Sequence, residues 1–220
     1  MKHIFYKIKN NLDLKVIGCY PQVDCLTIIQ CNILSVWKTY KVKPHLKFKM
    51  KNKAKLTDVL TTTCGPINDY LISPRMKDLL MKYNLMGHQI WDVDLYQNNK
   101  ILTYYWIHLS QPDLVNYLDY DHSVFCKSNI SQIFNSNIGQ KEEPIKINSF
   151  NHYRLLIEEN SPTFDVYLKN VKVTDSFNSS LDLFHFCLFD SDNYISEKLK
   201  IGLETEKISG IQIEEAFTIE

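Results

Sequence analysis

Glycine, proline and alanine are scarce in this sequence of 220 residues, which holds six, seven and two of them respectively. So little glycine and proline excludes collagen-like and low-complexity chains. Alanine is the best intrinsic helix former, and its scarcity beside many isoleucines and tyrosines favours β-rich structure. The shares of hydrophobic (45%) and charged (23%) residues are typical of a globular protein. We therefore expect one α+β domain over residues 1–220.

Long apolar runs are also lacking. No run approaches the ~20 residues of a membrane-spanning helix, and the first residues carry no apolar core of signal-peptide length. We expect a cytoplasmic protein that does not contact a membrane and that keeps its thiols reduced.

The sequence lacks the short motifs of common enzymes. It has no phosphate-binding glycine loop, no Gly-x-Ser-x-Gly elbow and no His-Glu-x-x-His zinc motif. No two cysteines have Cys-x-x-Cys spacing, so we expect buried free thiols. These cysteines are Cys19, Cys25, Cys31, Cys64, Cys126 and Cys187. The sequence thus predicts no catalytic residue, no cofactor and no metal site, and we do not expect an enzyme.

The formal net charge is zero, but the charges are unevenly distributed. Residues 1–60 hold 12 lysines and three acidic residues, which leaves 13 of the 25 basic and 22 of the 25 acidic residues to 61–220. We expect the two parts to attract each other within one fold. The alternative is a nucleic-acid binder that uses the basic stretch 36–56. It is disfavoured because the lysines there have few aromatic neighbours and no arginine.

Several segments have the patterns of β-strands. Residues 2–9 predict a first strand with Ile4, Tyr6 and Ile8 on one side. The apolar residues 25–37 predict a buried strand followed by a turn or a second strand. In 45–51 apolar residues alternate with lysines, which predicts a half-buried strand whose lysines protect a sheet edge. Residues 89–95 and 101–109 flank a polar turn and predict a hairpin. The sheets are therefore expected to be mostly antiparallel.

An internal repeat is the most informative feature of the sequence. Residues 64–91 and 187–214 align without a gap, and nine of the 28 positions are identical. In each copy a serine (Ser73, Ser196) is placed to cap a helix, and a glycine (Gly87, Gly210) follows to supply a left-handed turn position. The repeat predicts two related units of helix, glycine turn and strand. The polar segment 136–144 between them is a candidate loop or sub-boundary.

Polar and aromatic residues are dense between the two copies. Tyr117, Asp119, Tyr120, Asp121 and His122 could form a protein-contact loop, since tyrosine is enriched in such surfaces. The same residues could instead cap and pack a turn. A third interpretation is a small hydrolase or transferase that uses His122 with the nearby aspartates.

The repeated Ile-Ser-x-x-Met/Leu-Lys…Leu…Gly-x-Gln-Ile pattern resembles a known family. Together with the Tyr-Tyr-Trp strand, the Asp-Tyr-Asp-His-Ser segment and the Asp-Asn-Tyr-Ile-Ser segment, it is similar to the immunity protein eleven family over residues 56–216. That family, once a domain of unknown function, is encoded beside toxins of bacterial polymorphic-toxin and type VI secretion systems. The resemblance implies an immunity protein of bacterial competition, which binds and neutralises a cognate toxin by occlusion.

The charge distribution suggests where such a toxin would bind. An acidic surface steers a basic partner and raises its association rate. We therefore expect the contact surface in the acidic part 61–220, with Tyr117, Asp119, Tyr120, Asp121 and His122 as candidates. Charge reversal at Asp119 and Asp121 is expected to slow association at low salt.

Overall fold

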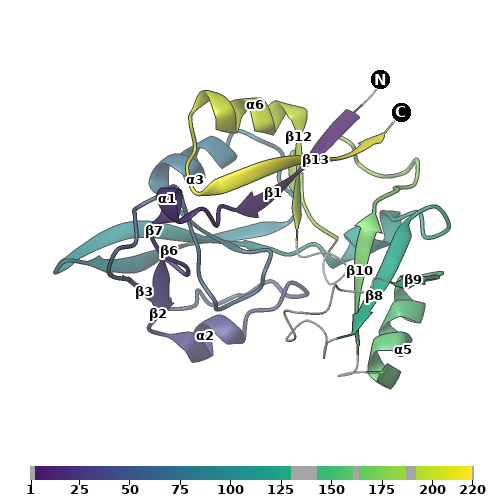
Figure 1. The fold of residues 1–220 in the computed structure, drawn as a ribbon, viewed down its shortest axis with the longest axis horizontal. Helices are drawn as coiled ribbons and strands as arrows, with labels where there is room; N and C mark the ends of the chain where they lie inside the picture. Colours follow the sequence, from purple (N-terminus) through teal and green to yellow (C-terminus); the bar gives the residue numbers. More distant parts are fainter. Residues whose placement is uncertain (1–2, 130–142, 161–163, 187–191, 220) are drawn as a thin grey trace.

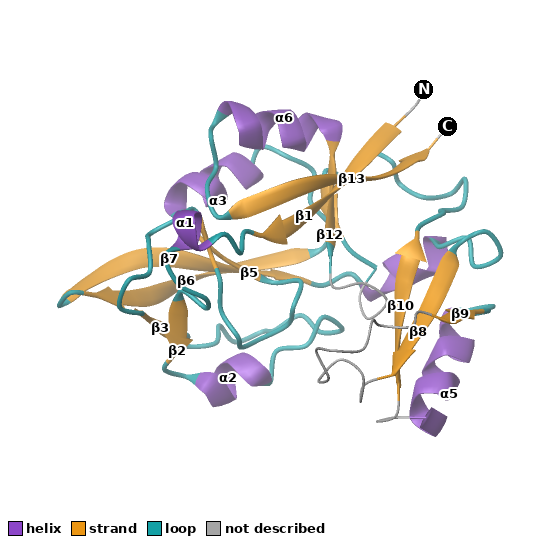
Figure 2. Cartoon of the chain, viewed as in Figure 1, coloured by secondary structure: helices purple, strands orange, loops and turns teal. Residues whose placement is uncertain are grey.

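The computed structural model describes residues 3–129, 143–160, 164–186 and 192–219. It is an α+β fold in which short helices lie against mostly antiparallel sheets (Figures 1 and 2), as the sequence predicts. The strands are β1 (His3–Asn10), β2 (Val23–Cys25), β3 (Lys47–Met50), β4 (Val59–Leu60), β5 (Tyr70–Ile72), β6 (His88–Gln97), β7 (Lys100–Leu109), β8 (Val124–Asn129), β9 (Glu143–Ile145), β10 (Phe164–Asn170), β11 (Leu183–Phe184), β12 (Asn193–Ser196) and β13 (Ile211–Ile219). The helices are α1 (Leu14–Ile17), α2 (Ile28–Asn32), α3 (Pro74–Leu80), α5 (Phe150–Asn160) and α6 (Glu197–Thr205), with a 3-10 helix at Pro112–Tyr117.

Three sheets are formed by the described strands. Their strand orders are β2-β3-β6-β7-β5-β4, β11-β12-β1-β13 and β10-β8-β9, and β3 with β6 is the one parallel pair of strands among them. Strands β6 and β7 form the predicted hairpin, and its turn residues Asn98 and Asn99 both have positive φ. Asparagine tolerates this left-handed conformation, which a tight hairpin turn requires. No helix of the described residues has the length and apolarity to span a membrane.

The two copies of the repeat fold alike. Strand β5 leads into α3 and then β6, and β12 leads into α6 and then β13. The Ser73 hydroxyl accepts a hydrogen bond from the Met76 amide at 3.1 Å, and the Ser196 hydroxyl accepts one from the Leu199 amide at 3.2 Å. The predicted serine caps are therefore both confirmed, and α3 and α6 lie side by side (Figure 1).

The second copy is completed by the N-terminal strand. The sheet segment β4-β5-β7-β6 has the same order and the same antiparallel pairing as β11-β12-β1-β13. The registers also agree, because Ile72 faces Tyr105 while Ile195 faces Tyr6. Strand β1 thus occupies in the second copy the position that β7 holds in the first. We call residues 58–110 the first unit, and residues 3–11 with 182–219 the second unit.

Each unit contributes an aspartate that joins the two units. The Asp58 carboxylate accepts hydrogen bonds from Ser73 of its own unit and from Ser209 of the other. In the same way Asp182 accepts from Ser196 of its own unit and from the Asn84 amide of the other. Burial alone would raise the pKa of Asp58, but the bonds from Arg75, Ser209 and Ser73 lower it to about 2. Each serine therefore caps a helix and also binds the aspartate that bridges the two units.

The glycines of the repeat meet different needs. Gly210 has a φ of 88°, as expected, but Gly87 is not in the left-handed region. Gly87 is needed for a close approach, because an added Cβ would lie 2.6 Å from the Ser110 carbonyl oxygen. At Gly202, which interrupts the apolar face of α6, a Cβ would lie 2.0 Å from the Tyr83 hydroxyl. The lack of a side chain there lets Tyr83 pack against α6.

Two strand predictions are wrong. Residues 25–37 are not a buried strand, because β2 ends at Cys25 and the short helix α2 follows, with Cys31 as its one buried residue. The alternation in 45–51 is confirmed, since Leu46, Phe48 and Met50 are buried. However, β3 lies between β2 and β6, so its lysines do not protect a sheet edge.

The predicted side of the first strand is also corrected. Phe5 and Ile8 are buried in β1, while Ile4 and Tyr6 are half-buried. A β-bulge shifts the register between Phe5 and Tyr6 and thereby breaks the simple alternation.

The unequal charges meet within the fold, as the sequence suggests. Lys7 lies 2.9 Å from Asp192, and Lys9 lies 2.9 Å from Glu214. The β10-β8-β9 sheet with α5 shares a buried cluster with both units, in which Phe125 belongs to the same core as Ile72 of the first unit and Phe5 of the second. The expected sub-boundary at 136–144 lies mostly outside the described residues.

Candidate functional site

The predicted contact segment is a turn that satisfies most of its own polar groups. Asp119 accepts hydrogen bonds at 3.1 Å from the Asp121 and His122 amides. Tyr120 donates to the Val115 carbonyl at 2.9 Å and stacks on Phe125. Tyr117 is half-buried against Phe177. Of the five predicted residues, Asp121 and His122 alone are exposed. The segment therefore presents a small polar surface.

His122 and Asp119 form a close pair, as an enzyme of the predicted kind would need. The Nδ1 of His122 lies 2.7 Å from the Asp119 carboxylate, and this contact lowers the pKa of Asp119. However, 75% of the His122 side chain is exposed. The adjacent Ser123 hydroxyl is occupied by hydrogen bonds with the Lys172 backbone. The pair therefore lies on the outside of a turn, and the Ser123 hydroxyl beside it is held by the backbone.

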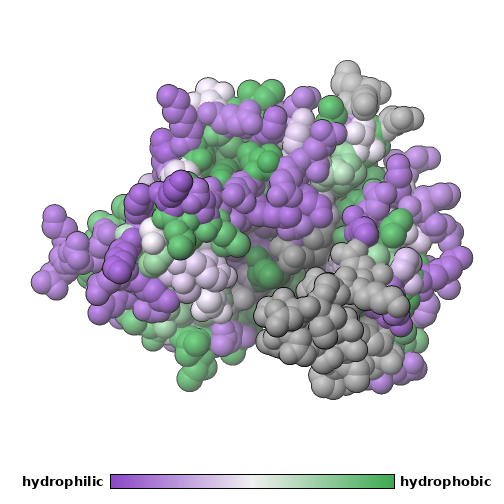
Figure 3. Space-filling model, in the orientation of Figure 1, coloured by the Kyte–Doolittle hydropathy of each residue, from purple (hydrophilic) through white to green (hydrophobic). Residues whose placement is uncertain are grey.

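Helix α2 carries a large exposed apolar surface that the sequence did not lead us to expect. Ile29 is 78% exposed, and three neighbours are each more than half exposed: Leu26, Ile28 and Ile33. Figure 3 shows hydrophobic surface at the lower edge of the molecule, where α2 lies in Figure 1. We call these four residues the α2 surface. Exposed apolar residues that cluster within eight positions are typical of a binding surface.

Lysines border the α2 surface. Leu26 lines one hollow together with Lys49, Lys51 and Lys53. Lys51 pairs with Asp24 at 3.3 Å, whereas neither Lys49 nor Lys53 has an ion-pair partner among the described residues. The rim of this apolar surface is therefore positively charged.

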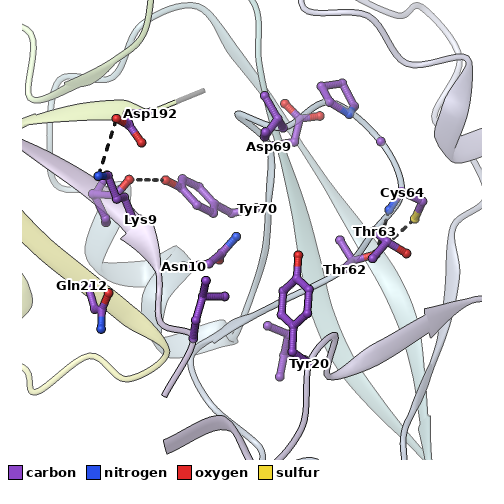
Figure 4. Close-up of a pocket in the computed structure, with 16 residues that line it drawn as sticks. Lys9, Asn10, Tyr20, Thr62, Thr63, Cys64, Asp69, Tyr70, Asp192 and Gln212 are labelled. Carbon is purple, nitrogen blue, oxygen red and sulfur yellow. Dashed lines mark hydrogen bonds and ion pairs between the residues drawn. The ribbon is translucent and has the colours of Figure 1, made fainter. Parts of the chain in front are cut away.

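A cavity of about 550 Å³ lies where the two units meet (Figure 4). The loop 62–67 forms one side of it and β1 forms the other, with Asp192 and Gln212 from the second unit. Asn10 lines this cavity, and its Oδ1 is a buried side-chain oxygen without a hydrogen-bond partner in the described part of the chain. The cavity is large enough for water or a small polar molecule.

An aspartate–histidine pair is fully buried beside this cavity. Asp69 accepts hydrogen bonds from the Trp106 indole at 2.7 Å and from His108 at 2.8 Å, and neither pair member has an exposed side chain. The second ring nitrogen of His108 lies 2.9 Å from the Lys38 carbonyl. Burial alone would lower the pKa of His108, but the Asp69 carboxylate and the Lys38 carbonyl raise it. Burial also raises the pKa of Asp69, so the pair holds a proton tightly between its two groups.

Three cysteines from distant parts of the N-terminal region meet in the protein. The sulfurs of Cys25, Cys31 and Cys64 all lie within 4.8 Å of one another. They are free thiols, of which Cys31 and Cys64 are buried, as expected, and Cys25 is half-buried. Hydrogen bonding from Cys31 lowers the pKa of Cys64 to about 6, which makes its sulfur the most readily deprotonated of the three. The sequence did not predict this group, because the spacing of its members matches no known motif.

Comparison with known proteins adds no relative. A scan against family models finds no match, and a search of curated proteins finds none.

Proposed function

We propose that the protein acts by binding another protein through the α2 surface, and that its partner is a cognate bacterial toxin. The observation that carries the proposal is the exposure of Leu26, Ile28, Ile29 and Ile33, which are all more than half exposed. Burial of apolar surface is the dominant favourable term in most protein association. The resemblance to the immunity protein eleven family supports a toxin as the partner and the cytoplasm as the site of action.

The lysine rim indicates the chemistry of the partner surface. Lys49 and Lys53 lack ion-pair partners among the described residues, so they favour a partner whose apolar patch is flanked by carboxylates. This differs from the basic partner that the composition of 61–220 suggested. Asp121 and His122 remain the exposed candidates for that other surface. The two surfaces predict opposite charges on the partner.

The proposal is tested with the toxin domain encoded by the neighbouring gene. Co-expression of the protein is expected to restore growth of cells that make the toxin. The variant Ile29→Asp is expected to weaken binding by about 30-fold, the effect of losing a central contact of about 2 kcal/mol. Because Ile29 is 78% exposed, the variant is expected to fold as the wild type does.

A matched control is Ile101→Asp, which places the same charge at another exposed isoleucine, on the β6–β7 hairpin. It is expected to protect cells as the wild type does. If Asp121→Lys fails to protect cells while Ile29→Asp still protects them, the contact surface lies in the acidic part of the chain. Failure of the wild-type protein to bind or protect would overturn the function itself.

A further inference from the structure

The three-cysteine group joins two cysteines that are six residues apart to a third that lies far away in the sequence. Cys25 is the last residue of β2, Cys31 lies in α2, and Cys64 lies in the loop that follows β4. Their sulfurs lie within 4.8 Å of one another. A soft metal ion bound by three thiolates needs sulfur atoms at comparable separations. With metal–sulfur bonds of about 2.3 Å in tetrahedral geometry, the sulfurs lie about 3.8 Å apart.

The local sequence builds this group. Gly65 follows Cys64 with a φ of 79°, and a Cβ there would lie 2.6 Å from the Trp106 ring and 3.1 Å from the Cys31 sulfur. The glycine therefore lets the loop pass close to Cys31. On the other side, the Thr27 carbonyl accepts a hydrogen bond from the Cys31 amide, and the Thr27 hydroxyl accepts one from the Lys47 amide. These bonds hold α2 against β3.

We propose that Cys25, Cys31 and Cys64 bind one thiophilic metal ion, with Zn²⁺ as the ion of best fit. Soft thiolate ligands select Zn²⁺ and Cu⁺ over Mg²⁺ and Ca²⁺. The surroundings favour the divalent ion, because Cys31 and Cys64 belong to an apolar core with Phe48 and Trp106. Three thiolates leave one negative charge with Zn²⁺ and two with Cu⁺, and buried charge is unfavourable.

The group also has a fourth position and a path for the ion. Three protein ligands leave one tetrahedral position for water. Cys64 lines the cavity of Figure 4 with Thr62 and Thr63, and the Thr62 hydroxyl lies 3.2 Å from the Cys64 sulfur. The ion can reach the group from the side of Cys25, which is half-buried.

Binding would replace thiol protons with the metal ion. Each cysteine that is protonated beforehand releases one proton to solvent, and each sulfur then donates an electron pair to Zn²⁺ without any change of oxidation state. The ion would tie α2 to β2 and to the loop after β4. A metal that binds the folded state and not the unfolded chain also raises thermal stability.

The test is a titration of the reduced full-length protein with Zn²⁺ in competition with a chelating indicator. We expect about one equivalent of Zn²⁺ per chain, release of protons and a rise in Tm. Titration with Cd²⁺ reads the ligands directly, because thiolate coordination gives an ultraviolet charge-transfer band that histidine coordination lacks. This second measurement needs no variant.

The variants Cys25→Ser and Cys64→Ser are expected to weaken Zn²⁺ binding at least ~10-fold, since even outer-shell partners contribute that much to affinity. Cys25→Ser is the safer of the two, because its side chain is half-buried. The matched controls are Cys19→Ser and Cys126→Ser, two free thiols outside the group. They should bind as the wild type does.

Three results would overturn the proposal. The first is absence of Zn²⁺ uptake by the reduced wild-type protein. The second is uptake that persists unchanged in both Cys25→Ser and Cys64→Ser. The third is Cd²⁺ binding without the thiolate band, which would assign the metal to histidines at the surface. None of these results bears on toxin binding, so the two proposals fail independently.

Discussion

The first and second units share a backbone but differ in chemistry at equivalent positions. In the first unit Asp69 pairs with His108 in a fully buried contact. At the equivalent positions of the second unit, Asp192 lies 3.9 Å from Lys9, which is 37% exposed. Each unit thus keeps an aspartate opposite a basic residue on its inner strand. Both aspartates line the same cavity, but the first unit buries both members of its pair.

The groups that hold the backbone are the ones that both units retain. Each unit has a serine cap, an aspartate that binds it and a glycine before the last strand. The Gly87 and Gly210 carbonyls accept equivalent amide hydrogen bonds from Ser110 and Asn11. These groups satisfy backbone donors and allow close approaches, and few residue types can do so. Side chains that only fill space are free to differ.

The largest expected difference between the units concerns their acidic residues. Asp69→Ala is expected to lower the free energy of unfolding by about 4 kcal/mol, because it leaves the buried Trp106 and His108 side chains without their hydrogen-bond partner. Asp192→Ala is expected to lower it by about 1 kcal/mol, because its lysine partners reach solvent. Urea denaturation of both variants measures the difference. Equal losses would show that burial does not distinguish the two pairs.

A second difference is in pH dependence, and it arises at His185. Burial lowers the pKa of His185 from 6.5 to about 4, whereas its equivalent in the first unit is Thr61, which does not titrate. The unfolded chain therefore takes up a proton before the folded one. The contribution of neutral His185 to the free energy of unfolding is fully present above about pH 6.5. It falls by about 3 kcal/mol as the pH drops to 4.

The variant His185→Gln is expected to remove this part of the acid destabilisation, as measured by urea denaturation at a series of pH values. Glutamine retains a donor for the Leu109 carbonyl, which His185 contacts at 3.3 Å. His45→Gln is the control, because His45 is exposed, and it should keep the wild-type slope. An unchanged slope in His185→Gln would contradict the assignment.

The two equivalent glycines should respond unequally to alanine. Gly210→Ala is expected to destabilise by about 2 kcal/mol, because a left-handed φ strains alanine and the Cβ would lie 2.1 Å from the Val59 carbonyl oxygen. Gly87→Ala is expected to lower the free energy of unfolding by about 1 kcal/mol less than Gly210→Ala does, since the φ of Gly87 is not left-handed. Thermal unfolding of both variants makes the comparison. A larger loss at Gly87 would mean that crowding by Ser110 outweighs backbone strain.

The smallest expected effect comes from a circular permutant, in which the split second unit becomes continuous and the continuous first unit becomes split. His3 pairs with Ile219, so a two-residue turn can join them while the chain is opened between Asn98 and Asn99. This permutant makes the second unit continuous and the first unit split. Because every strand pair is kept, its free energy of unfolding should stay within about 1 kcal/mol of the wild type. Failure to fold would show that the β6–β7 turn is needed for assembly.

Local patterns predicted much of the fold and little of the candidate sites. The caps at Ser73 and Ser196 and the β6–β7 hairpin follow from nearby residues. The prediction of a buried strand in residues 25–37 was wrong, because a short apolar run has no periodicity that distinguishes a buried strand from an exposed helix. The α2 surface was missed for the same reason. The cysteine group was missed because Cys64 joins Cys25 and Cys31 only through the fold.

The sequence by itself determined the α+β class, the two helix-and-strand units and the starts of their helices, because capping and alternation act over a few residues. The tertiary structure alone decided that β1 completes the second unit and that α2 faces solvent. It also decided which aspartate is buried with its basic partner and which sulfurs meet. Each of these depends on contacts between residues far apart in the chain, and such contacts leave no periodic signal in the sequence.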